Sequence, residues 1–129
     1  MNEETGRIQV LVAEDSDTER KIFMAVLEDA GLEPHAAPDG RYALDLCRII
    51  HPDVLVLDLG LPRLNGIDVL KRLRKDRKIN KTPVIVMTAD GRDHTSELAF
   101  YEGATDFVTK PVDPMDLVAR VREAAGLGA

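Results

Sequence analysis

The chain has 129 residues, of which 44% are hydrophobic and 31% are charged, the composition of a single globular domain. No apolar run approaches the roughly 20 residues of a membrane span, and the polar residues 1–7 lack the apolar segment of a signal peptide. The formal net charge of −6 argues against direct nucleic-acid binding. The single cysteine, Cys47, is expected to be a buried core thiol. We therefore expect a cytoplasmic protein that contacts neither membrane nor nucleic acid.

Strand and helix patterns alternate along the first part of the chain. An apolar run predicts a strand over residues 8–13, and the residues from Ser16 to Glu19 form a capping box that opens a helix. This helix has its predicted apolar stripe at Ile22, Phe23, Val26, Leu27 and Ala30. A weaker strand is predicted over residues 33–37, where Pro34 is typical of a strand at the edge of a sheet.

The same alternation continues to the end of the chain. A second helix opens at Asp39 or Gly40, with its apolar face at Ala43, Leu46, Cys47 and Ile50. Next we expect a strand over 54–58, a loop over 60–66 and a helix with Ile67, Leu70 and Leu73 inward. These are followed by a strand from Pro83 to Thr88, a helix within 92–102 and a strand over 105–109. The last helix is capped by Asp113 and has its apolar side toward the sheet, at Leu117, Val118, Val121, Ala124 and Ala125.

Five strands and five helices in strict alternation predict an α/β fold with a parallel sheet and right-handed crossovers. The strands at 8–13, 54–58 and 83–88 are almost wholly apolar and are expected in the centre. We therefore predict a flavodoxin-like, doubly wound sheet with strand order 2-1-3-4-5 and helices on both faces. Its ligand crevice would lie between the first and third strands.

Polar residues follow the apolar runs at the points where the predicted strands end. They are Glu14, Asp15, Asp58, Thr88 and Lys110. Because the carboxyl ends of parallel strands share one edge of the sheet, these side chains are expected to converge on one crevice. Three carboxylates, a hydroxyl and an ammonium group in one crevice suit a divalent cation and a phosphoryl group.

Carboxylates packed together need a cation, and oxygen ligands favour Mg²⁺, Mn²⁺ or Ca²⁺. We predict Mg²⁺, with Mn²⁺ as an alternative, held by the side chains of Asp15 and Asp58 and by the Gly60 carbonyl, with Glu14 acting directly or through water. A carboxylate beside a metal and an ammonium group can attack phosphorus and form an aspartyl phosphate. Lys110 would neutralise the phosphoryl oxygens, and Thr88 would donate a hydrogen bond to one of them.

Each of these residues alone has a plain structural explanation. Asp15 can cap a helix, Asp58 can end a strand, Thr88 is an ordinary β-former, and a lysine such as Lys110 is most often solvated. The prediction therefore depends on the set of residues at successive strand ends, and not on any one of them.

At these residues the chain resembles a response-regulator receiver domain of two-component signalling, of the chemotaxis-regulator type. The resemblance covers residues 8–125, so that residues 1–7 would be a polar extension and 126–129 a tail. It depends on Glu14-Asp15, on Asp58 after Val54-Leu55-Val56-Leu57, on Leu61-Pro62 with Asn65-Gly66, on Thr88-Ala89 and on Lys110-Pro111.

The resemblance implies that Asp58 accepts a phosphoryl group from a sensor histidine kinase or a phosphotransfer protein. It implies that Glu14 and Asp15 help to hold Mg²⁺, that Lys110 contacts the phosphoryl group, and that Thr88 moves toward it while the aromatic ring of Phe107 follows. It also implies a cis peptide bond between Lys110 and Pro111. The chain would catalyse only its own phosphoryl transfer and autodephosphorylation and would control a downstream protein or output domain.

Two groups of positions refine this expectation. Gly60 and Asp90 occupy positions that tune the phosphoryl lifetime in the family, which predicts an altered autodephosphorylation rate of undetermined sign. The face of the fourth helix, fifth strand and fifth helix is a candidate surface for a homodimer or partner, although Ser96 stands where the dimeric class usually has a lysine. Its residues are Tyr101, Glu102, Asp106, Asp116 and Arg120.

Other functional classes fit the sequence less well. A dehalogenase-like phosphatase would need a second acid two residues after Asp58, where the chain has Gly60. A flavodoxin-like cofactor binder needs a phosphate-cradling turn after the first strand, where Glu14 and Asp15 would repel phosphate. A degenerate receiver that acts only as a docking module would not need Asp58, Thr88 and Lys110.

The third helix ends in a basic stretch, which contains one acid, Asp76. The cations are Lys71, Arg72, Arg74, Lys75, Arg77, Lys78 and Lys81. We interpret this stretch as a solvated helix end whose cations favour its C-terminus. It would lie away from the crevice and serve docking rather than chemistry.

Overall fold

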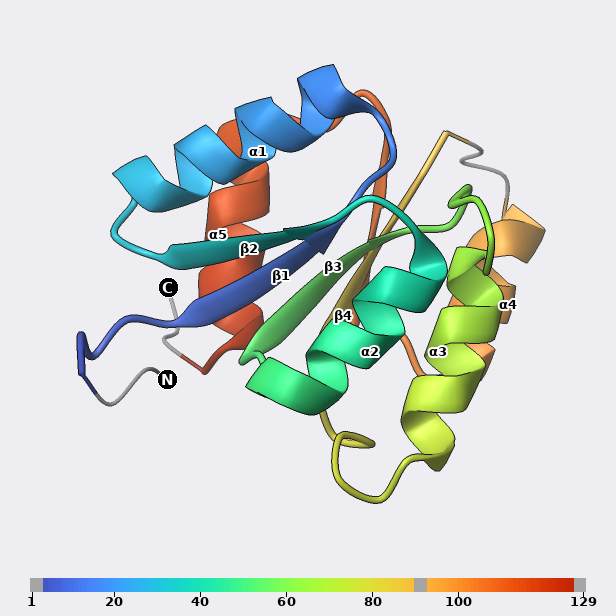
Figure 1. Ribbon diagram of the computed structural model, residues 1–129. Helices are drawn as coiled ribbons and strands as arrows, with labels where there is room; N and C mark the ends of the chain where they lie inside the picture. Colours follow the sequence, from blue (N-terminus) through green and yellow to red (C-terminus); the bar gives the residue numbers. More distant parts are fainter. Residues whose placement is uncertain (1–3, 90–92, 127–129) are drawn as a thin grey trace.

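The computed structural model describes residues 4–89 and 93–126, and Figure 1 shows their arrangement. Strands and helices alternate along these residues, as predicted. In chain order they are β1 (Gln9–Ala13), α1 (Asp17–Asp29), β2 (Glu33–Ala37), α2 (Gly40–Ile50), β3 (Val54–Asp58), α3 (Gly66–Lys75), β4 (Val84–Thr88), α4 (Asp93–Tyr101), β5 (Asp106–Thr109) and α5 (Pro114–Ala124).

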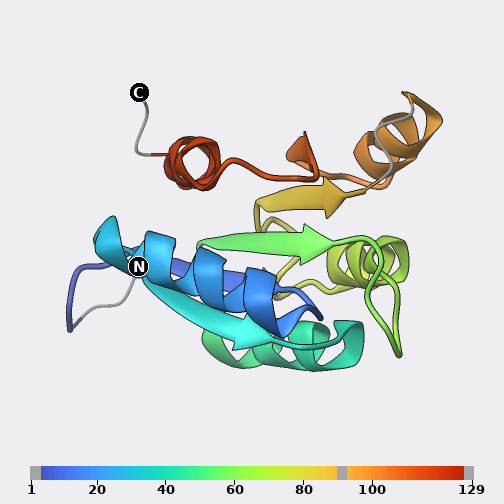
Figure 2. The same ribbon diagram turned by 90° about the horizontal axis from the view of Figure 1, so that it is seen from above.

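The sheet has the strand order β2-β1-β3-β4-β5, and each neighbouring pair is parallel. Figure 2 shows the arrowheads of β2, β3 and β4 pointing the same way. The predicted flavodoxin-like order is therefore confirmed, with β2 and its Pro34 at an edge. The strands end side by side, since Asp58 pairs with Met87 and Thr88 pairs with Thr109.

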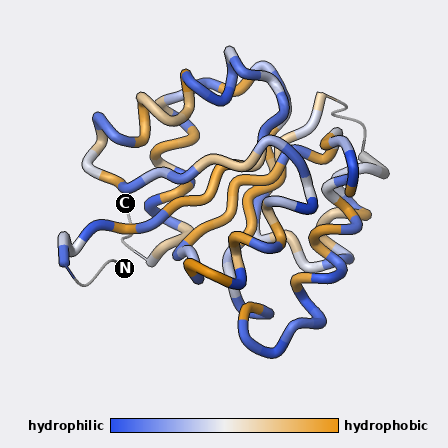
Figure 3. The backbone as a smooth tube through the Cα atoms, viewed as in Figure 1, coloured by the Kyte–Doolittle hydropathy of each residue, from blue (hydrophilic) through white to orange (hydrophobic). Residues whose placement is uncertain are grey.

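Alternate residues of the central strands face the two sides of the sheet, because side chains in a strand alternate between its faces. Val10 and Val56 pack with the apolar residues of α1 and α5. Leu11 and Leu57 pack with those of α2 and α3 and with Ala99 of α4. Helices therefore cover both faces (Figure 1), and Figure 3 shows the strands as the hydrophobic centre of the molecule.

The predicted helix faces were wrong at several positions. Ile22 is 47% exposed, because the buried side of α1 is centred on Phe23 and Leu27. Leu44 is fully buried although it was not in the predicted stripe of α2. It lies three residues before the buried Cys47, on the same side of the helix, and the presence of α3 beside α2 widens the face that is excluded from water.

The basic stretch is also not uniformly solvated. The guanidinium of Arg74 is partly buried and donates hydrogen bonds to three backbone carbonyls, those of Asn80, Thr82 and Gly103. The single acid, Asp76, accepts a hydrogen bond from Arg48 of α2 at 2.9 Å. Arg74 is therefore a structural crosslink between α3 and the segments around β4 and β5.

The loop after β3 is held in place by capping and by close backbone contact. Asn65 caps α3 by accepting a hydrogen bond from the Asp68 N–H at 3.0 Å. Gly66 approaches the backbone of β3 so closely that a Cβ atom there would lie 2.5 Å from Leu59 Cα and 2.6 Å from Asp58 O. A glycine is therefore needed directly behind Asp58. Among the described helices, none has the length and apolar character needed to cross a membrane.

Candidate phosphorylation and metal site

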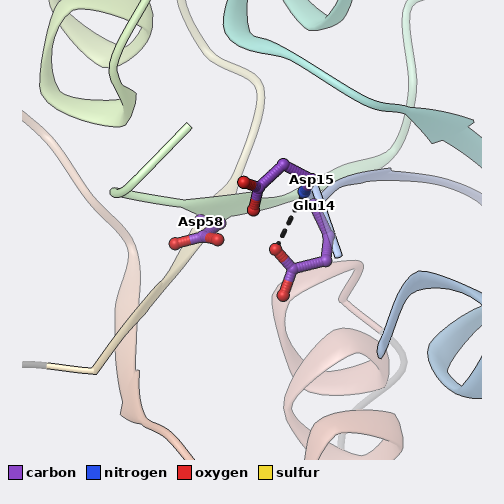
Figure 4. A group of neighbouring side chains, drawn as sticks. All are labelled: Glu14, Asp15 and Asp58. Atoms are coloured by element: carbon purple, nitrogen blue, oxygen red, sulfur yellow. Dashed lines mark hydrogen bonds between the residues drawn. The ribbon is translucent and has the colours of Figure 1, made fainter. Parts of the chain in front are cut away.

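Three carboxylates meet at the carboxyl edge of the sheet. Glu14 and Asp15 follow β1, and Asp58 ends β3. Each of the three can offer an oxygen so that the three atoms lie within 4.8 Å of one another, and Figure 4 shows the side chains gathered around one space. Glu14 and Asp58 are buried while Asp15 is exposed. The structure therefore brings together the three carboxylates that were expected to converge.

Lys110 completes this group from the end of β5. Its Nζ atom lies 2.7 Å from Oε1 of Glu14, 3.1 Å from Oδ2 of Asp58 and 3.2 Å from Oε2 of Glu19. The backbone N–H of Lys110 also donates to the Thr88 carbonyl at 2.8 Å. The Lys110–Pro111 peptide bond is cis, which confirms that expectation.

The Asp58 carboxylate is held by donors on both of its oxygens. Oδ1 accepts a hydrogen bond from the Gly60 N–H at 2.9 Å, and Oδ2 accepts from Lys110. A Cβ atom added to Gly60 would meet only Asp58 Oδ1, at 3.6 Å. This wall of the site therefore has room for a larger side chain, whereas the position of Asp58 itself is fixed.

Burial and proximity change the proton affinities of the site. Burial, assisted by hydrogen bonding to Asp58, raises the pKa of Glu14 to about 8. Burial also acts to raise the pKa of Asp58, but hydrogen bonds with Glu14, Gly60 and Lys110 outweigh it and hold that pKa below its ordinary value. Burial alone would lower the pKa of Lys110, but its hydrogen bonds and charge interactions with Glu14 and Asp58 outweigh burial and raise that pKa. The site therefore keeps an ionised Asp58 beside a cationic Lys110.

These residues fit a divalent cation. Carboxylate oxygens are hard donors, and the donor set of Glu14, Asp15 and Asp58 includes no sulfur or imidazole ligand. Without a cation, the crowding of the carboxylates is relieved by a proton on Glu14. Asp15 N–H donates to Glu14 Oε2 at 2.9 Å, which orients the Glu14 carboxylate (Figure 4). The acidic group can therefore bind a metal ion.

Thr88 and Phe107 lie on the same side of the sheet. Thr88 is 6% exposed, and Phe107 packs against the core on the side of α2, α3 and α4. Phe107 pairs in register with Val86, two residues before Thr88. Its ring centroid lies 6.5 Å from that of Phe100 in α4. The two residues named as a switch are therefore close along neighbouring strands, and their switching roles stay a prediction.

Charges on the predicted partner face are paired within the molecule. Arg120 donates to both oxygens of Asp106, at 2.8 and 2.9 Å, and to Asp116 at 2.9 Å. Glu102 instead lies 4.0 Å from Lys71 of α3. Tyr101 is 86% exposed. The structure thus brings together three of the five predicted residues.

Glu19 belongs to the site although the strand-end pattern did not assign it there. It was identified only as part of a capping box, of which the bond from its N–H to Ser16 Oγ is present at 3.3 Å. Its carboxylate also reaches Lys110. The available signal was its position four residues after Asp15, one turn along the helix that starts at the crevice. Asp90, the other predicted pocket-tuning residue, lies outside the described residues.

Comparisons with known proteins agree with this geometry. The family model of the response regulator receiver domain matches residues 10–122. The DNA-binding response regulator MtrA of Mycolicibacterium smegmatis is 38% identical over 119 residues, which cover 92% of this chain and 51% of MtrA. The regulatory protein AtoC of Escherichia coli is also 38% identical over 119 residues, but these cover only 25% of AtoC. The chain thus spans a quarter to a half of these relatives.

Solved structures show the same likeness over nearly their full lengths. The receiver domain of the Francisella response regulator 1452 has a TM-score of 0.88 and 32% identity, covering 94% of this chain and 98% of that one. The chemotaxis protein CheY4 of Vibrio cholerae has a TM-score of 0.87 and 28% identity, covering 92% and 99%. This chain therefore belongs to the response regulator receiver domains, the phosphorylation-dependent modules of two-component signalling.

Proposed function

We propose that Asp58 is the phosphoacceptor and that the donor is the phosphohistidine of a sensor histidine kinase or a phosphotransfer protein. A carboxylate oxygen of Asp58 forms an O–P bond as the N–P bond of the donor breaks, and the histidine nitrogen keeps the electron pair. The observation that carries this proposal is the Lys110 ammonium group, 3.1 Å from the Asp58 carboxylate in a crevice that it shares with Glu14 and Asp15.

Each residue of the site has a separate role in this transfer. Asp58 needs no general base, because its lowered pKa keeps it ionised. The Lys110 ammonium would move one of its hydrogen bonds from a carboxylate to a phosphoryl oxygen, and the Thr88 hydroxyl would donate to another. Asp15, Asp58 and the Gly60 carbonyl would hold Mg²⁺, or Mn²⁺, with Glu14 as a direct or water-mediated ligand. The bound ion would supply positive charge for the transferring group.

The consequence would be a shift between two packings of one surface. Thr88 would move toward the phosphoryl group and Phe107 would fill the space it leaves, which changes the face of α4, β5 and α5. That face would control a downstream protein or output domain, with a homodimer as one option. We assign residues 8–125 to this module, without nucleic-acid or membrane binding of its own, in the cytoplasm, and without catalysis beyond its own phosphoryl transfer and autodephosphorylation.

Intact-mass analysis after addition of acetyl phosphate, with and without Mg²⁺, tests this proposal. Wild type should gain one hydroxylamine-sensitive phosphoryl group only with Mg²⁺, and Asp58→Asn should gain none. Asp29→Asn removes an equivalent carboxylate at the far end of α1 and should behave as wild type. An unmodified wild-type protein that also fails to bind beryllofluoride would overturn the proposal and favour a phosphorylation-independent docking module.

A further inference from the structure

Glu19 reaches into the crevice from the first turn of α1. Its Oε2 atom accepts a hydrogen bond from Lys110 Nζ at 3.2 Å. The Glu19 side chain is 43% exposed, whereas those of Asp58 and Glu14 are 8% and 0% exposed. Glu19 therefore stands at the solvent side of Lys110, while the other two carboxylates lie inside.

The contacts of Lys110 leave it no spare donor. An ammonium group has three N–H bonds, and three carboxylates accept from Nζ, at 2.7, 3.1 and 3.2 Å. A phosphoryl oxygen that arrives at Lys110 must therefore displace one of them. Glu14 and Asp58 are buried at the carboxyl edge of the sheet and cannot turn into water, and release of the ionised Asp58 would leave a buried charge unpaired. The exposed Glu19 carboxylate can return to water and is the partner that leaves.

Glu19 also adds a negative charge at the solvent side of the site. Phosphodonors are anions, and they approach a site that already contains Glu14, Asp15 and Asp58. A fourth carboxylate at the solvent side repels them and competes with them for the same ammonium group.

We propose that Glu19 is a specificity-determining residue that slows the reaction of Asp58 with small anionic phosphodonors, by occupying Lys110 and by repelling the donor. The proposal rests on the proposed role of Asp58 as phosphoacceptor. The discrimination would therefore be strongest against donors with the most negative charge, such as small dianionic acyl phosphates.

The test compares Glu19→Gln with wild type, using rate constants for the phosphorylation of Asp58. Glutamine retains the capping-box preference at this helix position, so the fold is preserved. Two donors are used at saturating Mg²⁺: acetyl phosphate, which is dianionic near neutral pH, and phosphoramidate, which has one negative charge less. Glu28→Gln is the matched control, because it makes the same charge change in the same helix at an exposed position away from the crevice.

We expect Glu19→Gln to raise the rate constant with acetyl phosphate about fivefold and that with phosphoramidate by less, since the repulsion scales with donor charge. Added salt should accelerate wild type more than the variant. Glu28→Gln should match wild type. Equal rates for Glu19→Gln and wild type, or equal acceleration with both donors, would overturn the role of Glu19. An absence of any adduct on wild-type Asp58 would instead refute the proposed function.

Discussion

Arg74 of α3 donates two hydrogen bonds to the carbonyl of Gly103, at 3.0 Å from Nε and 2.7 Å from Nη2. Gly103 has a φ of +103°, and a Cβ atom on it would lie 2.8 Å from Arg74 Nε. The contact ties the turn after α4 to α3. Side chains at the end of α4 are largely exposed, with Phe100 49% and Tyr101 86% exposed. The hydrogen bonds from Arg74 therefore add a backbone anchor to the packing of Ala99 and the contact of Phe100 with Phe107.

Replacement of Arg74 by methionine should destabilise the protein. The substitution removes the donors for the carbonyls of Asn80, Thr82 and Gly103, and lost hydrogen bonds from a charged donor correspond to about 2 kcal/mol of unfolding free energy. Urea denaturation followed by circular dichroism measures the change. Arg72→Met, with the same change of charge at an exposed position of the same helix, should fall within about 0.5 kcal/mol of wild type. Equal midpoints for the two variants would contradict the crosslink.

Two glycines near Asp58 should respond differently to alanine. In Gly66→Ala the new Cβ atom meets backbone atoms of Leu59 and Asp58 at 2.5 and 2.6 Å, so we expect a loss of about 1–3 kcal/mol and slower phosphorylation of the displaced Asp58. In Gly60→Ala the nearest atom is Asp58 Oδ1 at 3.6 Å, an ordinary contact, and stability should change little. Melting curves of both variants decide this, and an equally stable Gly66→Ala protein would show that the loop after β3 can shift.

The stability of the magnesium-free protein should depend on the protonation of Glu14. Its pKa is raised from 4.5 to about 8 in the folded state, so the folded protein binds this proton more tightly than the unfolded chain. The resulting stabilisation is complete below pH 4.5 and is lost as the pH rises through about 8. Asp58 and Glu19 have lowered pKa values, so they stabilise the fold when ionised. This stabilisation is lost only at acidic pH and does not change as the pH rises through about 8. Urea midpoints in EDTA should therefore fall across this window.

Glu14→Gln supplies the comparison for that pH dependence. Glutamine imitates the protonated carboxyl group, so the variant should lose the part of the slope that Glu14 contributes and should be more stable than wild type near the upper end of the window. Parallel slopes for the two proteins would place the titration on another group.

Magnesium should stabilise the wild-type fold through Asp15. A ligand that binds only the folded state at a hundredfold excess over its dissociation constant adds about 2.7 kcal/mol. The rise in melting temperature on adding Mg²⁺ measures this effect. It should be abolished or strongly reduced in Asp15→Asn and unchanged in Asp29→Asn. A full magnesium shift in Asp15→Asn would remove Asp15 from the predicted ligands.

Much of the fold could be predicted from local patterns. The wholly apolar run before Asp58 indicated a buried strand, and Pro34 indicated an edge; the strand order that follows from them is the observed one. The ends of parallel strands necessarily share an edge, which is why Glu14, Asp58 and Lys110 could be grouped from the strand pattern alone. Helix caps such as Asp113 depend on neighbours only a few residues away and could be predicted equally well.

The remaining features depend on where distant segments meet. Glu19 and Lys110 are 91 residues apart, and the spacing of Glu19 from Asp15 places it near the crevice without showing that it pairs with Lys110. Arg74 is one of several cations in the basic stretch of the sequence. Its structural role comes from its hydrogen bonds to the carbonyl of Gly103, which lies 29 residues later in the chain. The raised pKa of Glu14 likewise arises from burial beside Asp58. The sequence by itself determined the elements and the residues at their ends, because these follow from local periodicity. The tertiary structure decided which charges are paired and which protons are retained, because those depend on distance and exclusion of water.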